Sequence, residues 1–274
     1  MGRELALLLS TQGCHLALCD LDEACLTETK QLVEALAPAG TRVTTFRCDV
    51  SQEAEVLAFR DAVLAEHQTD HVNLVFNNAG IAGGGSFLRD AREQWEKTFD
   101  VCWYGVYFGS RAFLPLLIAS TEGHLVNTSS VNGFWASAGL NRPHTAYAAA
   151  KFAVKGFSEA LVTELRNAAP HVLVSVVMPG HIGTSILANS SNVHGRSSTA
   201  ITEMSAAFRN NAPTTAEQAA RTILDGIRER RWRILVGEDA RVLDQMVRDT
   251  PEEAYEASFA QRLGELGVLR AILE

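Results

Sequence analysis

The chain has 274 residues, of which 47% are hydrophobic and 20% charged, so it is long enough to bury the core of one large globular domain. It carries 24 Lys and Arg against 32 Asp and Glu, and the resulting formal charge of -8 disfavours a nucleic-acid partner. No uninterrupted apolar run reaches the roughly 18 to 20 residues that span a bilayer, and residues 1–4 do not begin a signal sequence. We therefore predict a cytoplasmic protein that binds neither nucleic acid nor membrane. The five cysteines are an odd number with no Cys-x-x-Cys pair, so we predict no disulfide framework and no metal site.

In chain order, a short helix over 2–11 is followed by β-branched runs that alternate with longer segments of helical apolar spacing. Strand cores such as 72–76 and 172–177 are nearly all apolar, as expected for a parallel sheet covered by helices on both faces. The pattern predicts an α/β fold, a doubly wound parallel sheet, in a single domain over 1–274. The predicted strands are 15–20, 42–48, 72–77, 124–128, 172–178 and 233–237, and the predicted helices between them are 23–36, 53–66, 92–117, 146–166 and 216–230. A long loop over 182–214 and a helical tail over 240–274 complete the prediction.

The beginning of the chain departs from this fold. A doubly wound domain that binds a dinucleotide opens with a strand and a glycine-rich turn, and the helix that follows faces the pyrophosphate. This sequence opens inside the helix at Gly2, so the first strand and the glycine-rich turn are missing. We expect apolar edges on the neighbouring strands and fewer backbone amides for the pyrophosphate. One interpretation is an incomplete version of a longer product, and the other is a folded relative that binds cofactor poorly.

Tyr147 and Lys151 are four residues apart in the helix predicted over 146–166, so their side chains share one helix face. The ordinary pKa of a phenol is about 10. A neighbouring ammonium favours the phenolate and lowers this pKa, which makes the pair a candidate general acid/base. The same spacing arises by chance on many helices, so it is weak by itself.

Several strands end in small or polar residues. Ser130 lies in the stretch 127–133 after the fourth strand, while 77–80 and 179–184 follow two others. The carboxyl ends of parallel strands meet at one edge of the sheet, where open α/β proteins bind ligands. A hydroxyl there can bond a substrate oxygen, but Ser, Asn and Gly are also common turn residues.

Asp20 closes the strand over 15–20. A carboxylate at this position can accept both hydroxyls of an adenosine ribose and repels a 2′-phosphate. The alternative is a capping box in which Asp20 and Glu23 begin the next helix. The residues alone leave both interpretations open.

Taken in order, these residues resemble the short-chain dehydrogenase/reductase family, whose fold is of the Rossmann type. The resemblance runs from Gly2 to about residue 240. The ordered set is Asp20, Asp49-Val50, Asn77-Asn78-Ala79-Gly80, Ser130, Tyr147-x-x-x-Lys151 and Pro179-Gly180-x-Ile182-x-Thr184.

The resemblance implies an NAD(P)-dependent oxidoreductase that interconverts a secondary alcohol and a ketone, with an apolar small molecule as substrate. Tyr147 would be the catalytic acid/base, Lys151 would lower its pKa and hold the nicotinamide ribose, and Ser130 would orient the substrate oxygen. NAD is preferred to NADP because Leu21 and Asp22, not an arginine, follow Asp20, but NADP is not excluded. Besides Tyr147 and Lys151, the implied cofactor-binding residues are Gly2, Asp20, Asp49, Val50, Asn77, Ala79, Gly80, Pro179, Gly180, Ile182 and Thr184.

The resemblance also implies a substrate loop over 182–214 and a homodimer or homotetramer formed through the helices over 92–117 and 146–166. Two positions differ from the family's pattern. Cys102 stands where the family has an asparagine, and we interpret it as a packing residue. The spacing between Ser130 and Tyr147 is longer than usual, and we interpret His144 within it as part of a surface loop.

Two alternatives remain. The missing glycine-rich turn motivates a non-catalytic dinucleotide-binding or scaffold relative, although such a protein has no need of Ser130, Tyr147 and Lys151 together. The same tyrosine could also serve an epimerase or a dehydratase.

Overall fold

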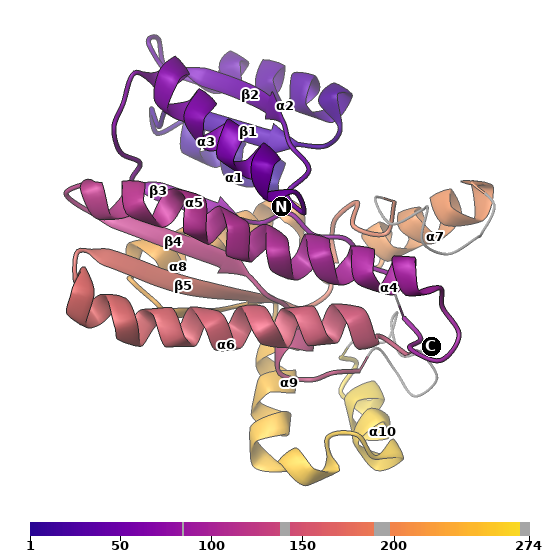
Figure 1. The fold of residues 1–274 in the computed structure, drawn as a ribbon. Helices are drawn as coiled ribbons and strands as arrows, with labels where there is room; N and C mark the ends of the chain where they lie inside the picture. Colours follow the sequence, from indigo (N-terminus) through magenta and orange to yellow (C-terminus); the bar gives the residue numbers. More distant parts are fainter. Residues whose placement is uncertain (84, 138–142, 189–197, 269–274) are drawn as a thin grey trace.

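The computed structural model of the chain describes residues 1–83, 85–137, 143–188 and 198–268. Strands and helices alternate as predicted, which confirms the α/β fold (Figure 1). The strands are β1 (Leu16–Asp20), β2 (Val43–Arg47), β3 (Leu74–Asn77), β4 (Gly123–Thr128), β5 (Val172–Pro179), β6 (Ile182–Gly183), β7 (Thr214–Thr215) and β8 (Arg233–Val236). The α-helices are α1 (Gly2–Ser10), α2 (Glu23–Leu36), α3 (Glu53–His67), α4 (Arg92–Phe99), α5 (Gly105–Ala119), α6 (Thr145–Ala168), α7 (Ser198–Asn210), α8 (Ala216–Arg228), α9 (Glu238–Asp249) and α10 (Ala257–Glu265).

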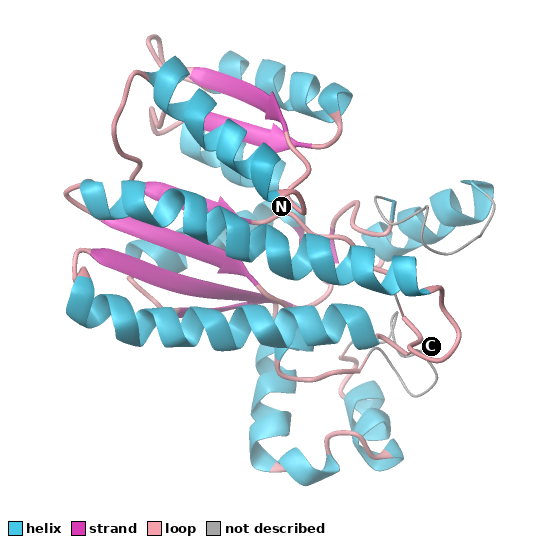
Figure 2. Cartoon of the chain, in the orientation of Figure 1, coloured by secondary structure: helices cyan, strands magenta, loops and turns pink. Residues whose placement is uncertain are grey.

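The parallel sheet is divided into two parts (Figure 2). One contains β1 and β2, and the other has the strand order β3-β4-β5-β8. In the part of the chain that the structure describes, no strand lies between β1 and β3, so each has a hydrogen-bonded neighbour on one side only. A separate parallel pair, β6 and β7, lies beyond the end of β5.

One apolar core joins the two parts of the sheet. Leu16 of β1 and Val126 of β4 belong to the same buried cluster, together with Leu5 of α1 and Ile223 of α8. The side chains expected on an open edge, Leu18, Leu74 and Phe76, pack against this cluster and are half-buried. Burial of apolar area, and not strand pairing, therefore holds the two parts together.

Helices cover both faces of the sheet. The helices α3, α5 and α6 lie on one face, and α1, α2 and α8 lie on the other (Figure 1). The helices α9 and α10 form a further unit below the sheet, with the short 3₁₀ helix η4 (Pro251–Glu253) between them. Trp135 joins this unit to the end of β4, because its indole N–H donates to the Ala254 carbonyl at 2.7 Å.

The helix predicted over 92–117 runs from Arg92 to Ala119 and contains one π-helical turn, η1 (Asp100–Tyr104). Its 28 residues include an 18-residue window with mean hydropathy 1.3, so by length and composition it could cross a membrane. The sequence prediction concerned uninterrupted apolar runs, and this helix contains Arg111. About half of the window (44%) is buried inside the protein, and Phe113 and Leu117 pack in the sheet's apolar clusters, as in a core helix.

The strand registers bring the carboxyl ends together. Asp20 is level with Arg47, Asn77 with Asn127, and Thr128 with Val177. The last residues of the predicted strands thus lie along one edge. The candidate site residues come directly after these strand ends and therefore lie at this edge of the sheet.

Two helical glycines give a matched test of how tightly the layers pack. A Cβ on Gly109 of α5 would lie 2.2 Å from Asn77 Oδ1, whereas a Cβ on Gly156 of α6 would meet nothing within 4 Å. We predict that Gly109→Ala lowers the free energy of unfolding by about 1–3 kcal/mol, because the core must shift to make room. Gly156→Ala should raise it by about 0.5–1 kcal/mol through helix propensity. Urea unfolding followed by circular dichroism measures both, and equal effects would contradict the packing described.

Candidate active site

The end of β4 and the helix α6 are held together by two hydrogen bonds between neighbouring residues. The Lys151 ammonium donates to the Thr128 carbonyl at 2.8 Å, and the Ser129 hydroxyl donates to the Lys151 carbonyl at 2.7 Å. Gly133, in the 3₁₀ turn η2 (Val131–Gly133), allows this approach because a Cβ there would lie 2.3 Å from Ser129 Oγ. The first turns of α6 are thereby fixed against the carboxyl edge of the sheet.

This docking brings the three predicted catalytic residues together. Tyr147 lies one turn before Lys151, and the Lys151 Nζ is 5.5 Å from the centre of its ring. The side chain of Ser130 lies near enough to the Tyr147 phenol to lower its pKa. All three side chains are buried. Their arrangement can hold a proton on the tyrosine oxygen beside a hydroxyl that binds a second oxygen.

Burial controls the ionisation of this group. It raises the pKa of Tyr147 well above the ordinary value, and the charge of a Cys102 thiolate would raise it further, while the Ser130 side chain lowers it. Burial also lowers the pKa of Lys151. The expectation that Lys151 depresses the pKa of Tyr147 is thus not met here, because desolvation dominates and the ammonium points at the Thr128 carbonyl.

Cys102 is fully buried in the π-helical turn η1. Its thiol donates to the Ile81 carbonyl at 3.3 Å, and it packs in one cluster with Tyr147 and Ala150. These contacts agree with the interpretation of Cys102 as a packing residue. Ile186, from the segment after β6, packs against the same cluster and so lies beside the tyrosine.

The side chains of Asn77 and Asn78 differ in their hydrogen bonding. The Asn77 amide donates within the protein, to Asn127 Oδ1 at 2.8 Å and to Ser110 Oγ at 3.1 Å, so the side chain predicted to bind cofactor is already used in the core. Asn78, which the sequence analysis did not assign, has a buried Oδ1 without a hydrogen-bond partner. A Cβ on Gly2 would lie 3.0 Å from Asn78 Nδ2, so the N-terminus of α1 closely approaches this orphan amide.

Asp20 is exposed at the end of β1, and its carboxylate accepts the Asp22 backbone N–H at 3.1 Å. The capping-box interpretation is wrong, because Asp22 is the N-cap of α2 and accepts the Cys25 N–H at 3.0 Å. Asp49 accepts both the backbone N–H and the hydroxyl of Ser51. Asp20 therefore keeps a carboxylate facing solvent at the sheet edge.

The segment after β5 is closely packed. A Cβ on Gly180 would lie 2.3 Å from both carboxylate oxygens of Asp239, so only glycine fits there. Ile182 is buried, and the Thr184 N–H donates to its carbonyl at 2.8 Å.

Ala79 and Gly80 follow β3 at the same edge, and a Cβ on Gly80 would lie 3.6 Å from Lys151 Nζ. Pro179 ends β5, and Val50 contacts Gly105 of α5.

His144 was interpreted as a surface-loop residue, but the structure places it against the candidate catalytic tyrosine. The rings of His144 and Tyr147 are 4.7 Å apart, and His144 is half-buried. It immediately precedes α6, three residues before Tyr147. Because α6 begins at Thr145, His144 lies about one helical turn before Tyr147, which its interpretation as a loop residue did not anticipate.

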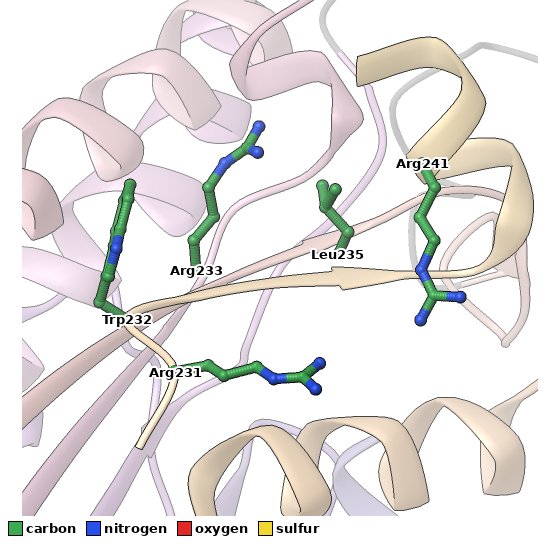
Figure 3. A pocket seen from close by; sticks show the side chains of 5 residues that line it. All are labelled: Arg231, Trp232, Arg233, Leu235 and Arg241. Carbon is green, nitrogen blue, oxygen red and sulfur yellow. The ribbon is translucent and has the colours of Figure 1, made fainter. Parts of the chain in front are cut away.

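A cavity of about 280 Å³ lies elsewhere, beside β8, the outer strand of the four-stranded part. Figure 3 shows Arg231 and Arg241 on one side of β8 and Arg233 and Leu235 on the other. Each guanidinium is already paired with a carboxylate. The pairs are Arg231 with Glu229, Arg241 with Glu238, and Arg233 with Asp244. The three arginines that line the cavity are therefore already in ion pairs, and none of the predicted catalytic residues lines it.

Comparison with known sequences links these features to characterised folds. Residues 1–194 match the family described as short chain dehydrogenase. SadH of Mycobacterium tuberculosis, which is named as an oxidoreductase, is 40% identical over 248 residues, or 90% of this chain and 86% of that protein. Epidermal retinol dehydrogenase 2 of Mus musculus is 38% identical over 164 residues, or 60% of this chain and 50% of that protein.

Solved structures show the same fold. A short chain dehydrogenase/reductase from Burkholderia phymatum, crystallised in complex with NAD, superposes with a TM-score of 0.80 at 30% identity and covers 92% of this chain and 90% of its own. Levodione reductase gives a TM-score of 0.71 at 25% identity, with 86% and 90% covered.

Proposed function

The chain belongs to the short-chain dehydrogenase/reductase family and is an oxidoreductase, and we propose that it transfers a hydride between a nicotinamide cofactor and a secondary alcohol or ketone. The observation that carries this proposal is the buried group of Ser130, Tyr147 and Lys151 at the carboxyl edge of the sheet. Proton exchange with an alcohol or carbonyl oxygen needs such a positioned acid/base beside a second hydroxyl.

The residues present fit a dinucleotide. The orphan Asn78 Oδ1, beside Gly2, is a buried acceptor that a ligand hydroxyl or amide would satisfy. Asp20 would hold the adenosine ribose and exclude a 2′-phosphate, so the cofactor is NAD in preference to NADP. The NAD complex of the Burkholderia phymatum relative supports this choice. Lys151 would hold the nicotinamide ribose, Asp49 and Val50 would hold the adenine, and Ala79 and Gly80 would contact the middle of the cofactor.

Pro179, Gly180, Ile182 and Thr184 would frame the nicotinamide, which supplies the hydride donor or acceptor when bound. The Asn77 side chain is occupied, so any contact from Asn77 would use its main chain. In reduction, Ser130 would hold the carbonyl oxygen and Tyr147 would donate its Oη proton to that oxygen. Burial keeps this proton on Tyr147, which suits the acid role. In oxidation the deprotonated form of the same oxygen would take the proton from the alcohol.

The substrate would be apolar near the reacting carbon. Ile186 packs against the cluster that contains Tyr147, and the ring of His144 lies 4.7 Å from the tyrosine ring. The named activities of two relatives, a retinol dehydrogenase and a levodione reductase, support an alcohol/ketone pair of this kind.

We further propose that the protein is a cytoplasmic homodimer or homotetramer. Aromatic side chains in contact run along α4 and η1, where Trp95 stacks on Phe99 and Phe99 meets Tyr104 edge to face. Tyr104 is 39% exposed and Phe152 of α6 is 41% exposed, so this face is apolar yet open. A second copy covering the face would bury it. Phe113 of α5 cannot contribute to such a contact, because it is buried in the core.

Tyr147→Phe tests the proposed reaction. We predict a loss of turnover of about 10²- to 10⁴-fold, because the proton donor is removed while the ring is kept. Tyr107→Phe, in α5, is the control and should retain turnover. The assay follows NADH formation with a panel of apolar secondary alcohols and NADH loss with the matching ketones. Cofactor binding by the wild type without turnover of any of them would favour the non-catalytic alternative.

Asp20→Asn tests the cofactor preference. We predict that the ratio of NADPH to NADH dissociation constants falls by about fivefold or more, since a charge next to a phosphate in water contributes about 1 kcal/mol. Asp22→Asn is the matched control, because it removes the same charge two residues away and asparagine still caps α2. Fluorescence titration of the wild type and the two variants measures all six constants. An unchanged ratio in Asp20→Asn would contradict the role of Asp20.

Tyr104→Glu tests the assembly. A carboxylate within the aromatic face should shift the protein to monomers, because the charge would be buried without a partner. Leu36→Glu, at a 54% exposed apolar position on α2, should leave the assembly unchanged. Size-exclusion chromatography with light scattering gives the mass of each. A monomeric wild type would overturn the proposal.

A further inference from the structure

His181 is a buried titratable residue that the proposed reaction does not use. It is 2% exposed and directly follows β5 and Gly180. Its Nε2 lies 2.7 Å from the Phe208 carbonyl of α7, and the rings of the two residues are 4.1 Å apart. One side chain thus makes both a polar and an apolar contact with the last turns of α7.

The main chain of His181 is fixed from the opposite side. Its N–H donates to the Asp239 carboxylate at 2.6 Å, and the same carboxylate accepts the Ala240 N–H at 3.0 Å. Gly180 and Gly237 leave the room that this carboxylate occupies, since a Cβ on either would lie 2.3 Å from it. The main chain of His181 is therefore held by α9, while its imidazole contacts α7.

In the part of the chain that the structure describes, two further contacts lie near this end of α7. Arg209 donates to Ser185 Oγ at 3.0 Å in an exposed pair, and Ile182 pairs with Thr214 in the short β6–β7 ladder. An exposed hydrogen bond contributes little, because water competes for both groups. Of the three contacts, the hydrogen bond between His181 and Phe208 is the one made by a buried polar side chain. Its neighbours in sequence, Ile182 and Thr184, are the residues assigned above to the nicotinamide.

We propose that His181 is a positioning residue, which sets the distance between the end of α7 and the nicotinamide-binding segment and thereby the apparent affinity for the alcohol or ketone. The substrate part of this inference rests on the proposed function. A carbonyl oxygen only accepts, so Nε2 carries the hydrogen and donates to it. Protonation of the imidazole leaves this donor in place. The contact therefore needs a donor at the Nε2 position and not a charge.

The test compares three substitutions of His181. His181→Phe keeps an aromatic ring but has no donor, His181→Asn has a donor that is too short to reach, and His181→Gln places an amide N–H near the position of Nε2. Hydrogen–deuterium exchange measures the amides of 203–210, with those of α3 as the internal reference. We expect exchange in 203–210 to rise about 3- to 10-fold in the Phe and Asn variants and to stay near the wild-type rate in Gln, because one net hydrogen bond is lost or kept. If the Phe variant does not fold, the Asn variant decides.

Steady-state kinetics adds a second readout. The Phe and Asn variants should raise KM for the substrate about 3- to 10-fold, while kcat changes less, and the Gln variant should restore KM. Wild-type exchange rates in the Asn variant, or a Gln variant as fast as Phe, would overturn the positioning role. If the wild type turns over no substrate but the exchange pattern appears, the contact stands and the proposed function fails. The two failures are thus distinguishable.

Discussion

The reciprocal pair of hydrogen bonds between β4 and α6 is the constraint on which the site depends. Lys151 gives its ammonium to the Thr128 carbonyl and receives the Ser129 hydroxyl at its own carbonyl. Both bonds are buried, where an unpaired partner would be costly, so the register between strand and helix is fixed. Because Tyr147 lies one helical turn from Lys151 and Ser130 follows Ser129 directly, the same two bonds place the proposed acid/base beside the proposed substrate-binding hydroxyl.

Burial has opposite consequences for the two ionisable members of the site. It raises the pKa of Tyr147 and lowers that of Lys151, so both groups are pushed toward their neutral forms. A bound polar ligand would add hydrogen bonds to the one that Lys151 makes with Thr128. The oxygen of Asn78 has no hydrogen-bond partner in the described structure. The edge is therefore built for a ligand with several polar groups, as a dinucleotide is.

Local pattern predicted strands β1–β5 and β8 and the helices that alternate with them, because apolar periodicity and strand-end residues are properties of neighbouring positions. The prediction of a loop over 182–214 was wrong, because β6, α7 (Ser198–Asn210) and the start of β7 lie within it. The ordered motif predicted that Ser130, Tyr147 and Lys151 meet at one edge. The internal hydrogen bonds of Asn77, the ring contact of His144 with Tyr147 and the hydrogen bond from His181 to Phe208 were not predicted. The first and the last join different elements, whose distance depends on packing, and the ring contact depends on where α6 begins. The net effect on the pKa of Tyr147 was likewise decided by burial, which spacing along a helix does not reveal.

The most direct test of the central claim, that this sheet edge binds a nicotinamide dinucleotide, is a titration of the 274-residue protein with NADH and with NADPH, followed by nicotinamide fluorescence. Saturable NADH binding that is tighter than NADPH binding and is displaced by NAD is the predicted result. The absence of saturable binding by either cofactor would contradict it.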